Sequence, residues 1–243
     1  MKTILVTGGA GFLGSHTCLI LLQSGFEIFV VDSFINSSSK SLKSIIKILK
    51  TQGKDLEKNL HFFKADITNE KKIEDIFKLA AELNKSIDAV VHFAGLKSVS
   101  ESIFNPLSYW ENNVNGTIRL LKIMEKYNCK CIVFSSSATV YRAQTGKLLK
   151  EEDFCDPINP YGQTKLAIEK LLNDIYKSSS SECRIAYLRY LNPVGAHESG
   201  LTEEDPLGNP NNIYPQITKV AIGELNEIRY MAQIGLLMTV QAL

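Results

Sequence analysis

The sequence Thr7-Gly8-Gly9-Ala10-Gly11-Phe12-Leu13-Gly14 lies between a short apolar run, Ile4–Val6, and a segment with apolar residues at helical spacing, Phe12–Gln23. A short apolar run followed by a glycine-rich turn and an amphipathic segment predicts a strand, a tight turn and a helix. These elements make up the first strand–helix unit of an α/β domain, and the rest of the chain is interpreted outward from them.

The glycines of this turn have separate expected roles. Gly8 permits the tight turn, Gly11 lets the backbone approach a pyrophosphate, and Gly14 lets the helix pack against the strand. The N–H groups and the positive dipole end of the helix N-terminus would bind the phosphates. The sequence therefore predicts a dinucleotide site here, and the alternative interpretation is a tight turn without a ligand.

Apolar runs and helical patterns alternate over the first 191 residues. The elements expected after the first pair are strand Ile28–Val31, helix Lys40–Gln52, strand Leu60–Phe63, helix Glu70–Asn84, strand Asp88–Phe93, helix Leu107–Tyr127, strand Cys131–Ser135, helix Tyr161–Ser178 and strand Arg184–Leu191. Strands separated by helices pair in parallel through right-handed crossovers. The predicted fold class is α/β, with a doubly wound parallel sheet of the Rossmann type in residues 1–191.

The pattern weakens from Asn192 into a segment rich in proline, glycine and asparagine, followed by one expected helix, Tyr214–Leu225. We expect residues 192–243 to form an incomplete substrate-binding domain above the sheet.

Composition excludes several classes of function. The 27 lysines and arginines nearly balance the 26 acidic residues, so the charge gives no reason to expect a nucleic acid or an anionic membrane as partner. The five cysteines lack paired CxxC spacing, so we expect free thiols and no metal site. The N-terminus lacks a signal-peptide pattern and no apolar run reaches membrane-spanning length. These features predict a cytoplasmic protein.

Asp32 ends the second expected strand, 24 residues after Gly8. An acid roughly 20 residues after the first glycine binds the adenine ribose hydroxyls in dinucleotide-binding domains. Because a carboxylate repels a 2′-phosphate and no arginine follows closely, the expected cofactor is NAD rather than NADP. Asp66 and Ile67, after the third strand, are expected at the adenine edge, although Asp66 could instead cap the next helix.

A catalytic group is expected from three residues. Ser137 lies at the carboxyl end of an expected strand, and Tyr161 and Lys165 are four residues apart at the start of a helix, on one face. A tyrosine titrates near pH 10, so a base at neutral pH needs a shift of about three units. The Lys165 ammonium and a cationic nicotinamide could together supply that shift. Tyr161 would then remove a hydroxyl proton while Ser137 binds the same oxygen.

Seven motifs resemble the extended short-chain dehydrogenase/reductases, and within them the UDP-glucose 4-epimerases, from Met1 to about Ile228. They are TGGAGFLGSHT, HFAGLKSVSES, NNVNGT, FSSSATVY, YGQTK, LRYLNPVGAH and EDPLGNPNN. The resemblance implies these NAD contacts: Phe12, Leu13, Asp32, Asn36, Asp66, Ile67, Phe93, Ala94, Gly95, Lys97, Asn112, Tyr161, Lys165 and Leu191. It places Ser137, Tyr161, Asn192 and Asn212 at the substrate.

The resemblance further implies interconversion of UDP-glucose and UDP-galactose through a 4-keto sugar, with NAD regenerated in the site. Related families that dehydrate or decarboxylate nucleotide sugars carry acidic residues after the serine motif, where this chain has Ala138-Thr139-Val140. This difference favours epimerisation. The resemblance also suggests a homodimer through the helices Leu107–Tyr127 and Tyr161–Ser178.

The sequence departs from the family at Arg142, at Leu191 and above all in its length. The resemblance stops near residue 229, and the remaining tail matches nothing expected of the family. We expect a frameshift that truncated an epimerase, and the alternative is an apolar replacement helix. Two alternative functions remain open. The chain could be a truncated protein that binds NAD without turnover, or an enzyme that acts on another nucleotide sugar.

Overall fold

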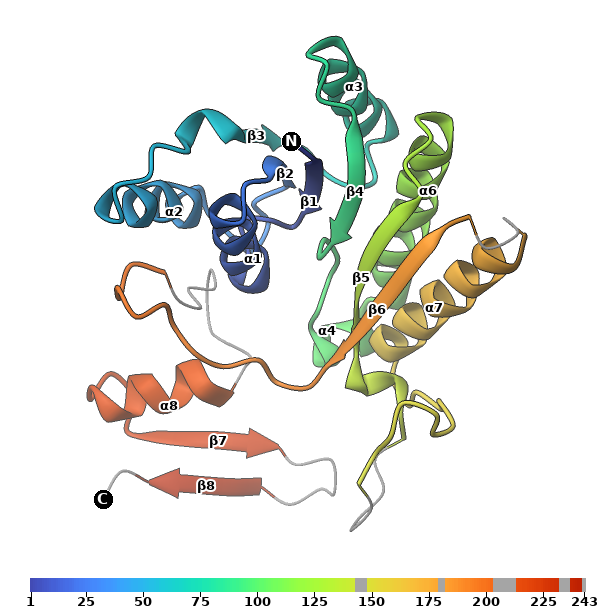
Figure 1. Cartoon of the computed structure of the whole chain (residues 1–243). Coiled ribbons are helices and arrows are strands. Elements are labelled where there is room, and N and C mark those ends of the chain that lie inside the picture. Colours follow the sequence, from blue (N-terminus) through green and yellow to red (C-terminus); the bar gives the residue numbers. More distant parts are fainter. Residues whose placement is uncertain (143–147, 179–181, 203–212, 232–236, 242–243) are drawn as a thin grey trace.

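A parallel sheet of six strands forms the centre of the fold (Figure 1). The computed structural model describes residues 1–142, 148–178, 182–202, 213–231 and 237–241. The strands, in chain order, are β1 (Thr3–Thr7), β2 (Glu27–Asp32), β3 (Leu60–Lys64), β4 (Ile87–His92), β5 (Cys131–Ser137) and β6 (Arg184–Tyr190). Their spatial order is β3-β2-β1-β4-β5-β6. This order reverses direction between β1 and β4, the point at which such sheets bind dinucleotides.

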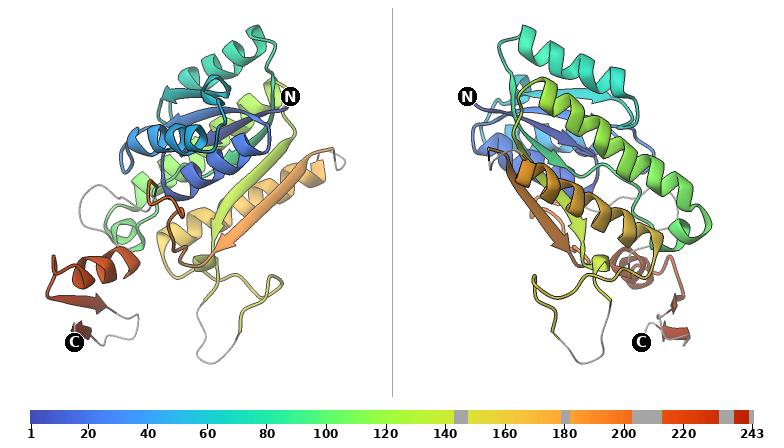
Figure 2. Two further views of the ribbon diagram at one scale, coloured as in Figure 1. Left: turned by 60° about the vertical axis from the view of Figure 1, so that its left-hand side comes forward. Right: turned by 90° about the vertical axis from the view of Figure 1, so that its right-hand side faces the viewer.

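Helices cover both faces of this sheet (Figure 2). The helices α1 (Phe12–Gln23) and α2 (Lys40–Thr51) lie on one face, while α3 (Glu70–Glu82), α6 (Gly116–Lys126) and α7 (Pro160–Ser178) lie on the other. Each face has its own buried apolar cluster. The predicted doubly wound α/β fold is therefore confirmed.

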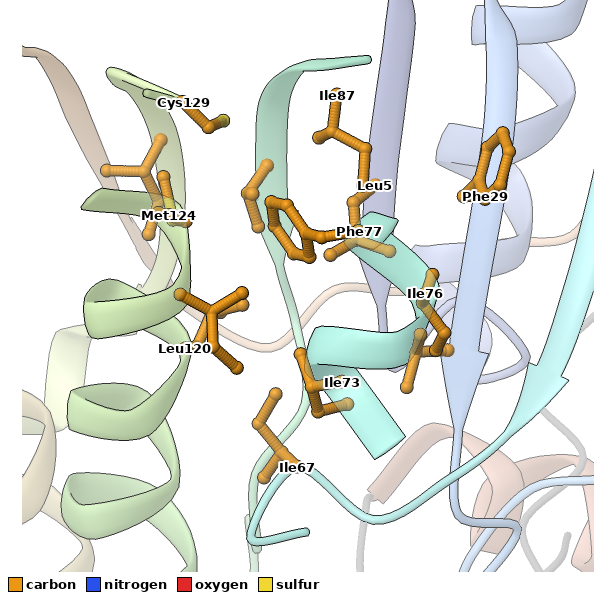
Figure 3. Close-up of a cluster of buried hydrophobic side chains, with 14 of the residues drawn as sticks. Leu5, Phe29, Ile67, Ile73, Ile76, Phe77, Ile87, Leu120, Met124 and Cys129 are labelled. Atoms are coloured by element: carbon orange, nitrogen blue, oxygen red, sulfur yellow. The ribbon is translucent and has the colours of Figure 1, made fainter. Parts of the chain in front are cut away.

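The larger apolar cluster explains why the central strands contain nearly continuous apolar runs. Leu5 and Phe29 project from β1 and β2 toward Phe77 of α3, and Leu120 of α6 lies nearby (Figure 3). All four side chains are almost completely buried. Because a central parallel strand is covered on both faces, its successive side chains are all apolar instead of alternating with polar ones.

The helix expected over Leu107–Tyr127 is divided in the structure. Two short helices, α4 (Val99–Phe104) and α5 (Pro106–Tyr109), come first, and a π-helical segment, Trp110–Asn115, then leads into α6. Pro106 begins α5 at a position where its missing N–H costs nothing. Short π-helical segments are frequent at functional sites, and this one carries an asparagine that contacts the candidate site described below.

The chain after β6 continues into α8 (Ile213–Ala221) and an antiparallel hairpin of β7 (Glu227–Met231) and β8 (Leu237–Gln241). The expected helix was longer, to Leu225, but Gly223 adopts a φ of +78° and ends it early. The described residues of the tail lie in β7 and β8 and not in the helix that was the alternative. Two 3₁₀ turns, Glu57–Asn59 and Ala138–Val140, complete the described elements. In the parts of the chain described here, no helix has the length and apolar character needed to span a membrane.

Candidate active site

The glycine turn packs tightly against the loop that follows β4. Gly8 has a φ of +67°, and a Cβ there would lie 2.7 Å from the Ala94 nitrogen. A Cβ on Gly14 would lie 2.2 Å from the Gly8 carbonyl oxygen. Gly11 has an ordinary extended conformation and begins α1 without a side-chain cap. The first N–H groups of α1 are therefore directed at the space above this turn, where a phosphate would bind.

Asp32 fixes the neighbouring turn through both carboxylate oxygens. Oδ2 accepts a hydrogen bond from the Ala10 nitrogen at 2.9 Å, and Oδ1 accepts from the Phe34 nitrogen at 2.9 Å and the Ser37 hydroxyl at 2.7 Å. A carboxylate has about four acceptor positions. Three are occupied by protein groups, so this geometry leaves room for one further donor, such as a ribose hydroxyl.

Asp66 and Ile67 are placed differently from each other. Asp66 Oδ1 accepts from the nitrogen and the hydroxyl of Thr68, at 2.8 Å and 2.6 Å. Asn69, not Asp66, is the N-cap of α3 and accepts from the Lys72 nitrogen. Ile67 is buried in the larger apolar cluster. The alternative role of Asp66 as a helix cap is therefore wrong.

Ser137, Tyr161 and Lys165 come together at the carboxyl end of β5. Tyr161 and Lys165 lie on the same buried face of α7, as the four-residue spacing predicts. The Lys165 ammonium lies 5.7 Å from the centroid of the Tyr161 ring and donates to the Ser135 carbonyl at 2.8 Å. The Ser137 hydroxyl is close enough to the Tyr161 phenol to affect its pKa. The arrangement places a hydroxyl, a phenol and a cation within one small volume.

Burial dominates the electrostatics of this group in the polypeptide. It raises the pKa of Tyr161, and the nearby Ser137 hydroxyl lowers that pKa only in part. Burial also lowers the pKa of Lys165 to about 8. The predicted depression of the Tyr161 pKa requires the Lys165 ammonium and a cationic nicotinamide together, so it stays a prediction.

The start of α7 explains how Tyr161 reaches this position. Asn159 accepts from the Gly162 nitrogen through its side chain at 2.8 Å, and Pro160 is the first helical residue. An asparagine cap followed by proline is a strong helix start. A Cβ on Gly162 would lie 2.5 Å from the Thr139 carbonyl oxygen, so the helix approaches the segment after Ser137 very closely.

Two buried polar residues near this group were not predicted. Asn113, from the π-helical segment, accepts from the Leu96 nitrogen at 2.8 Å and donates to the Leu96 carbonyl and the Thr164 hydroxyl. His92 bonds to the hydroxyls of Thr7 and Thr117 at 2.6 Å and 2.9 Å, and burial lowers its pKa to about 3. The sequence offers no signal for either role, since the π-helical turn is what directs Asn113 inward.

The remaining sequence-predicted residues spread around this edge of the sheet. Phe12, Leu13, Phe93, Ala94 and Asn112 are half-buried, whereas Asn36, Gly95 and Lys97 are exposed. Leu191 and Asn192, directly after β6, are also exposed. Asn212 lies outside the described residues.

The chain resembles known proteins over nearly its whole length. A family model described as GDP-mannose 4,6 dehydratase matches residues 5–233. The bifunctional UDP-glucose 4-epimerase and UDP-xylose 4-epimerase 1 of Pisum sativum is 48% identical over 228 residues, which are 93% of this chain and 62% of that protein. The UDP-glucose 4-epimerase of Bacillus subtilis (strain 168) is 47% identical over 225 residues, with the same coverage.

Solved structures agree with these relatives. The UDP-glucose 4-epimerase from Bifidobacterium longum in complex with NAD+ and UDP has a TM-score of 0.83 and 44% identity, covering 93% of this chain and 64% of that one. The enzyme from Stenotrophomonas maltophila, with bound NAD and formylated UDP-arabinopyranose, has a TM-score of 0.84 and 42% identity, covering 94% and 64%. The chain thus spans a little under two thirds of the length of these proteins.

Proposed function

The chain belongs to the protein family described as GDP-mannose 4,6 dehydratase, and we propose that it is the NAD-binding and catalytic part of an enzyme that interconverts UDP-glucose and UDP-galactose. The similar epimerases support the substrate class. The observation that carries the proposal is that Ser137, Tyr161 and Lys165 lie together at the carboxyl end of β5. Because the chain covers 62% of those relatives, the activity of the whole enzyme is part of the proposal.

NAD is the proposed cofactor, and the residues present fit it. The open N-terminus of α1 and the close packing of Gly8 and Gly14 leave space for a pyrophosphate. Asp32 has one acceptor position left for a ribose hydroxyl. The complexes of similar epimerases with NAD support this assignment. When bound, NAD supplies the hydride acceptor and donor for the reaction.

Three side chains have proposed parts in the proton transfer. Tyr161, ionised to the phenolate, takes the proton from the sugar 4-hydroxyl and returns it after the sugar has turned over. Ser137 donates to the same oxygen and stabilises the carbonyl that forms there. Lys165 holds a positive charge below the phenol, because its hydrogen bond to Ser135 fixes the ammonium within the site. Burial of all three groups strengthens these interactions.

Epimerisation is favoured over dehydration by the residues after Ser137. The turn Ala138–Val140 carries no carboxylate, and the Thr139 hydroxyl donates to Ser137 Oγ at 2.9 Å. Dehydration of a nucleotide sugar needs an added acid and base for the departing water. We therefore assign the reaction at C4 without elimination.

Three further parts of the proposal concern organisation. We place the boundary between the nucleotide-binding part, 1–191, and the substrate-side part, 192–243, at the end of β6. We also propose a homodimer through the helices predicted over Leu107–Tyr127 and Tyr161–Ser178. The 84% exposed Leu107 at the start of the first, and the 82% exposed Phe104 of α4 just before it, support an interface there. All five cysteines are free thiols, which is typical of the cytoplasm.

The decisive experiment is purification of this chain, quantification of NAD released on denaturation, and a coupled assay with UDP-galactose. We expect bound NAD and measurable UDP-glucose formation. Bound NAD without turnover would support the alternative of a cofactor-binding remnant, and turnover only of another nucleotide sugar would correct the substrate. A chain without bound NAD would refute the proposal.

A further inference from the structure

A buried ion pair lies beside the proposed catalytic residues and takes no part in the chemistry above. Arg189 of β6 donates from Nη2 to Glu169 Oε2 at 2.7 Å and from Nε to Glu169 Oε1 at 3.0 Å. The two side chains are 17% and 3% exposed. A two-pronged contact of this kind fixes the orientation of both partners as well as their distance.

The carboxylate of this pair also binds the strand that carries the serine motif. Ser136 donates to Glu169 Oε1 at 2.5 Å, and its neighbour Ser135 accepts from Lys165 at 2.8 Å. Lys165 and Glu169 are four residues apart and therefore lie on successive turns of one face of α7. Two consecutive residues of β5 are thus bonded to two consecutive turns of α7, directly before Ser137.

The guanidinium of the pair extends this connection to two more segments. Arg189 is paired with Ser136 in the β5–β6 ladder. Its Nη1 donates to the Tyr141 hydroxyl and, at 2.8 Å, to the Glu151 carbonyl. Tyr141 and Glu151 lie in the segment between Ser137 and the start of α7. One ion pair therefore joins β5, β6, α7 and the segment that follows Ser137.

We propose that Glu169 and Arg189 are positioning residues that fix α7 against β5 and so set the distance between the Ser137 hydroxyl and the Tyr161 phenol. A buried ion pair is often no more stabilising than apolar side chains of similar volume, so stability alone does not account for it. A fully bonded polar network specifies one geometry. The predicted change in kcat rests on the proposed function, whereas the predicted change in the distance between the two oxygens does not.

The test replaces the ion pair and the serine bonded to it by apolar side chains of similar volume: Ser136→Ala, Glu169→Met and Arg189→Leu in one variant. We expect it to fold with a melting temperature near that of the parent and to retain NAD. Its kcat for UDP-galactose should fall about 10- to 100-fold with KM nearly unchanged, since a misplacement of about 1 Å has an effect of this size. Crystals of parent and variant should show the Ser137 Oγ to Tyr161 Oη distance widened by about 1 Å.

The control variant removes an exposed ion pair near the opposite ends of β5 and α7, Lys130→Ala with Glu182→Ala, whose side chains are 46% and 64% exposed. It should match the parent in both measurements. An apolar variant with parental kcat and parental oxygen distance would overturn the inference.

Two further measurements test the inference if the apolar variant does not fold or the parent is inactive. If the apolar variant does not fold, Arg189→Lys keeps the charge but loses the planar fork. It should widen the oxygen distance and lower kcat in the same direction, and a parental result would overturn the inference. If the parent itself does not convert UDP-galactose, the proposed function fails, whereas the crystallographic distance still decides whether the pair positions Tyr161.

Discussion

Lys165 Nζ donates to the Ser135 carbonyl across 2.8 Å, so the ammonium is held by the backbone of β5 and not by the phenol of Tyr161. The same cation lies 4.8 Å from the centroid of the Phe134 ring and 5.7 Å from that of Tyr161. The strand carrying the serine motif therefore sets where the positive charge lies. The phenol of Tyr161, the proposed base, lies beside that fixed charge.

Tyr161→Phe removes the proposed base while keeping the aromatic ring that packs edge-on against Tyr109. We expect turnover of UDP-galactose to fall by about 10² to 10⁴, the usual contribution of a positioned acid or base. Bound NAD, measured after denaturation, should be retained, because the glycine turn, Asp32 and the other predicted NAD contacts are unchanged. A variant that retains parental turnover would remove Tyr161 from the mechanism.

Lys165→Met should abolish turnover and yet stabilise the fold at pH 7. Burial lowers the folded-state pKa of Lys165 to about 8, so holding the charge costs free energy below pH 8. After the lost hydrogen bond to Ser135 is allowed for, we expect a gain of about 1 to 3 kcal/mol. The gain should disappear as the pH rises from 8 toward 10.5, where the unfolded chain binds more protons than the folded one. Urea unfolding of both proteins at pH 7 and pH 9.5 measures this difference, and a gain that does not depend on pH would contradict it.

His92→Gln should make the protein less sensitive to acid. Burial, with a smaller effect of the Lys165 charge, lowers the pKa of His92 to about 3. Between pH 6.5 and about pH 3 the unfolded chain binds a proton that the folded chain excludes. The free energy of unfolding therefore decreases as the pH is lowered. Between pH 6.5 and 5 the parent should lose about 2 kcal/mol more than the variant. Equal losses in urea unfolding at the two pH values would show that His92 is not buried in its neutral form.

Gly14→Ala should destabilise the glycine turn far more than Gly11→Ala. The added Cβ would lie 2.2 Å from the Gly8 oxygen in the first variant and 3.3 Å in the second. The first contact forces the turn to move, and we expect a loss of about 1 to 3 kcal/mol in stability together with loss of bound NAD. Melting temperature and NAD content of both variants are the measurements. Similar behaviour of the two would mean that the turn adapts without cost.

Asn113→Ala and Asn112→Ala separate a structural role from a predicted cofactor contact. Asn113 bonds to both backbone polar groups of Leu96, so its removal should cost about 1 to 3 kcal/mol in urea unfolding. Asn112 is half-buried, and its removal should change stability by less than about 0.5 kcal/mol. If Asn112 contacts NAD as the resemblance implies, Asn112→Ala should still lower NAD affinity. A larger loss of stability for Asn112→Ala than for Asn113→Ala would contradict these two roles.

Local sequence determined the elements and their order. The strand, glycine turn and helix around Gly8 have bounds close to those expected, because a tight turn with positive φ and a buried apolar run are local requirements. Alternation of strands and helices then fixed the parallel sheet, since connections of this length cross over in one hand. The same reasoning placed Tyr161 and Lys165 on one face of α7.

Tertiary structure alone decided which polar groups meet and how they are charged. The turn of Asn113 toward Leu96, the bond from Lys165 to Ser135, and the contact of Arg189 with Glu169 each join residues distant in the chain. Burial likewise raises the pKa of Tyr161 and lowers that of Lys165. Desolvation and hydrogen bonding depend on the packing of several elements around one point, and residue spacing along the chain carries no information about that packing.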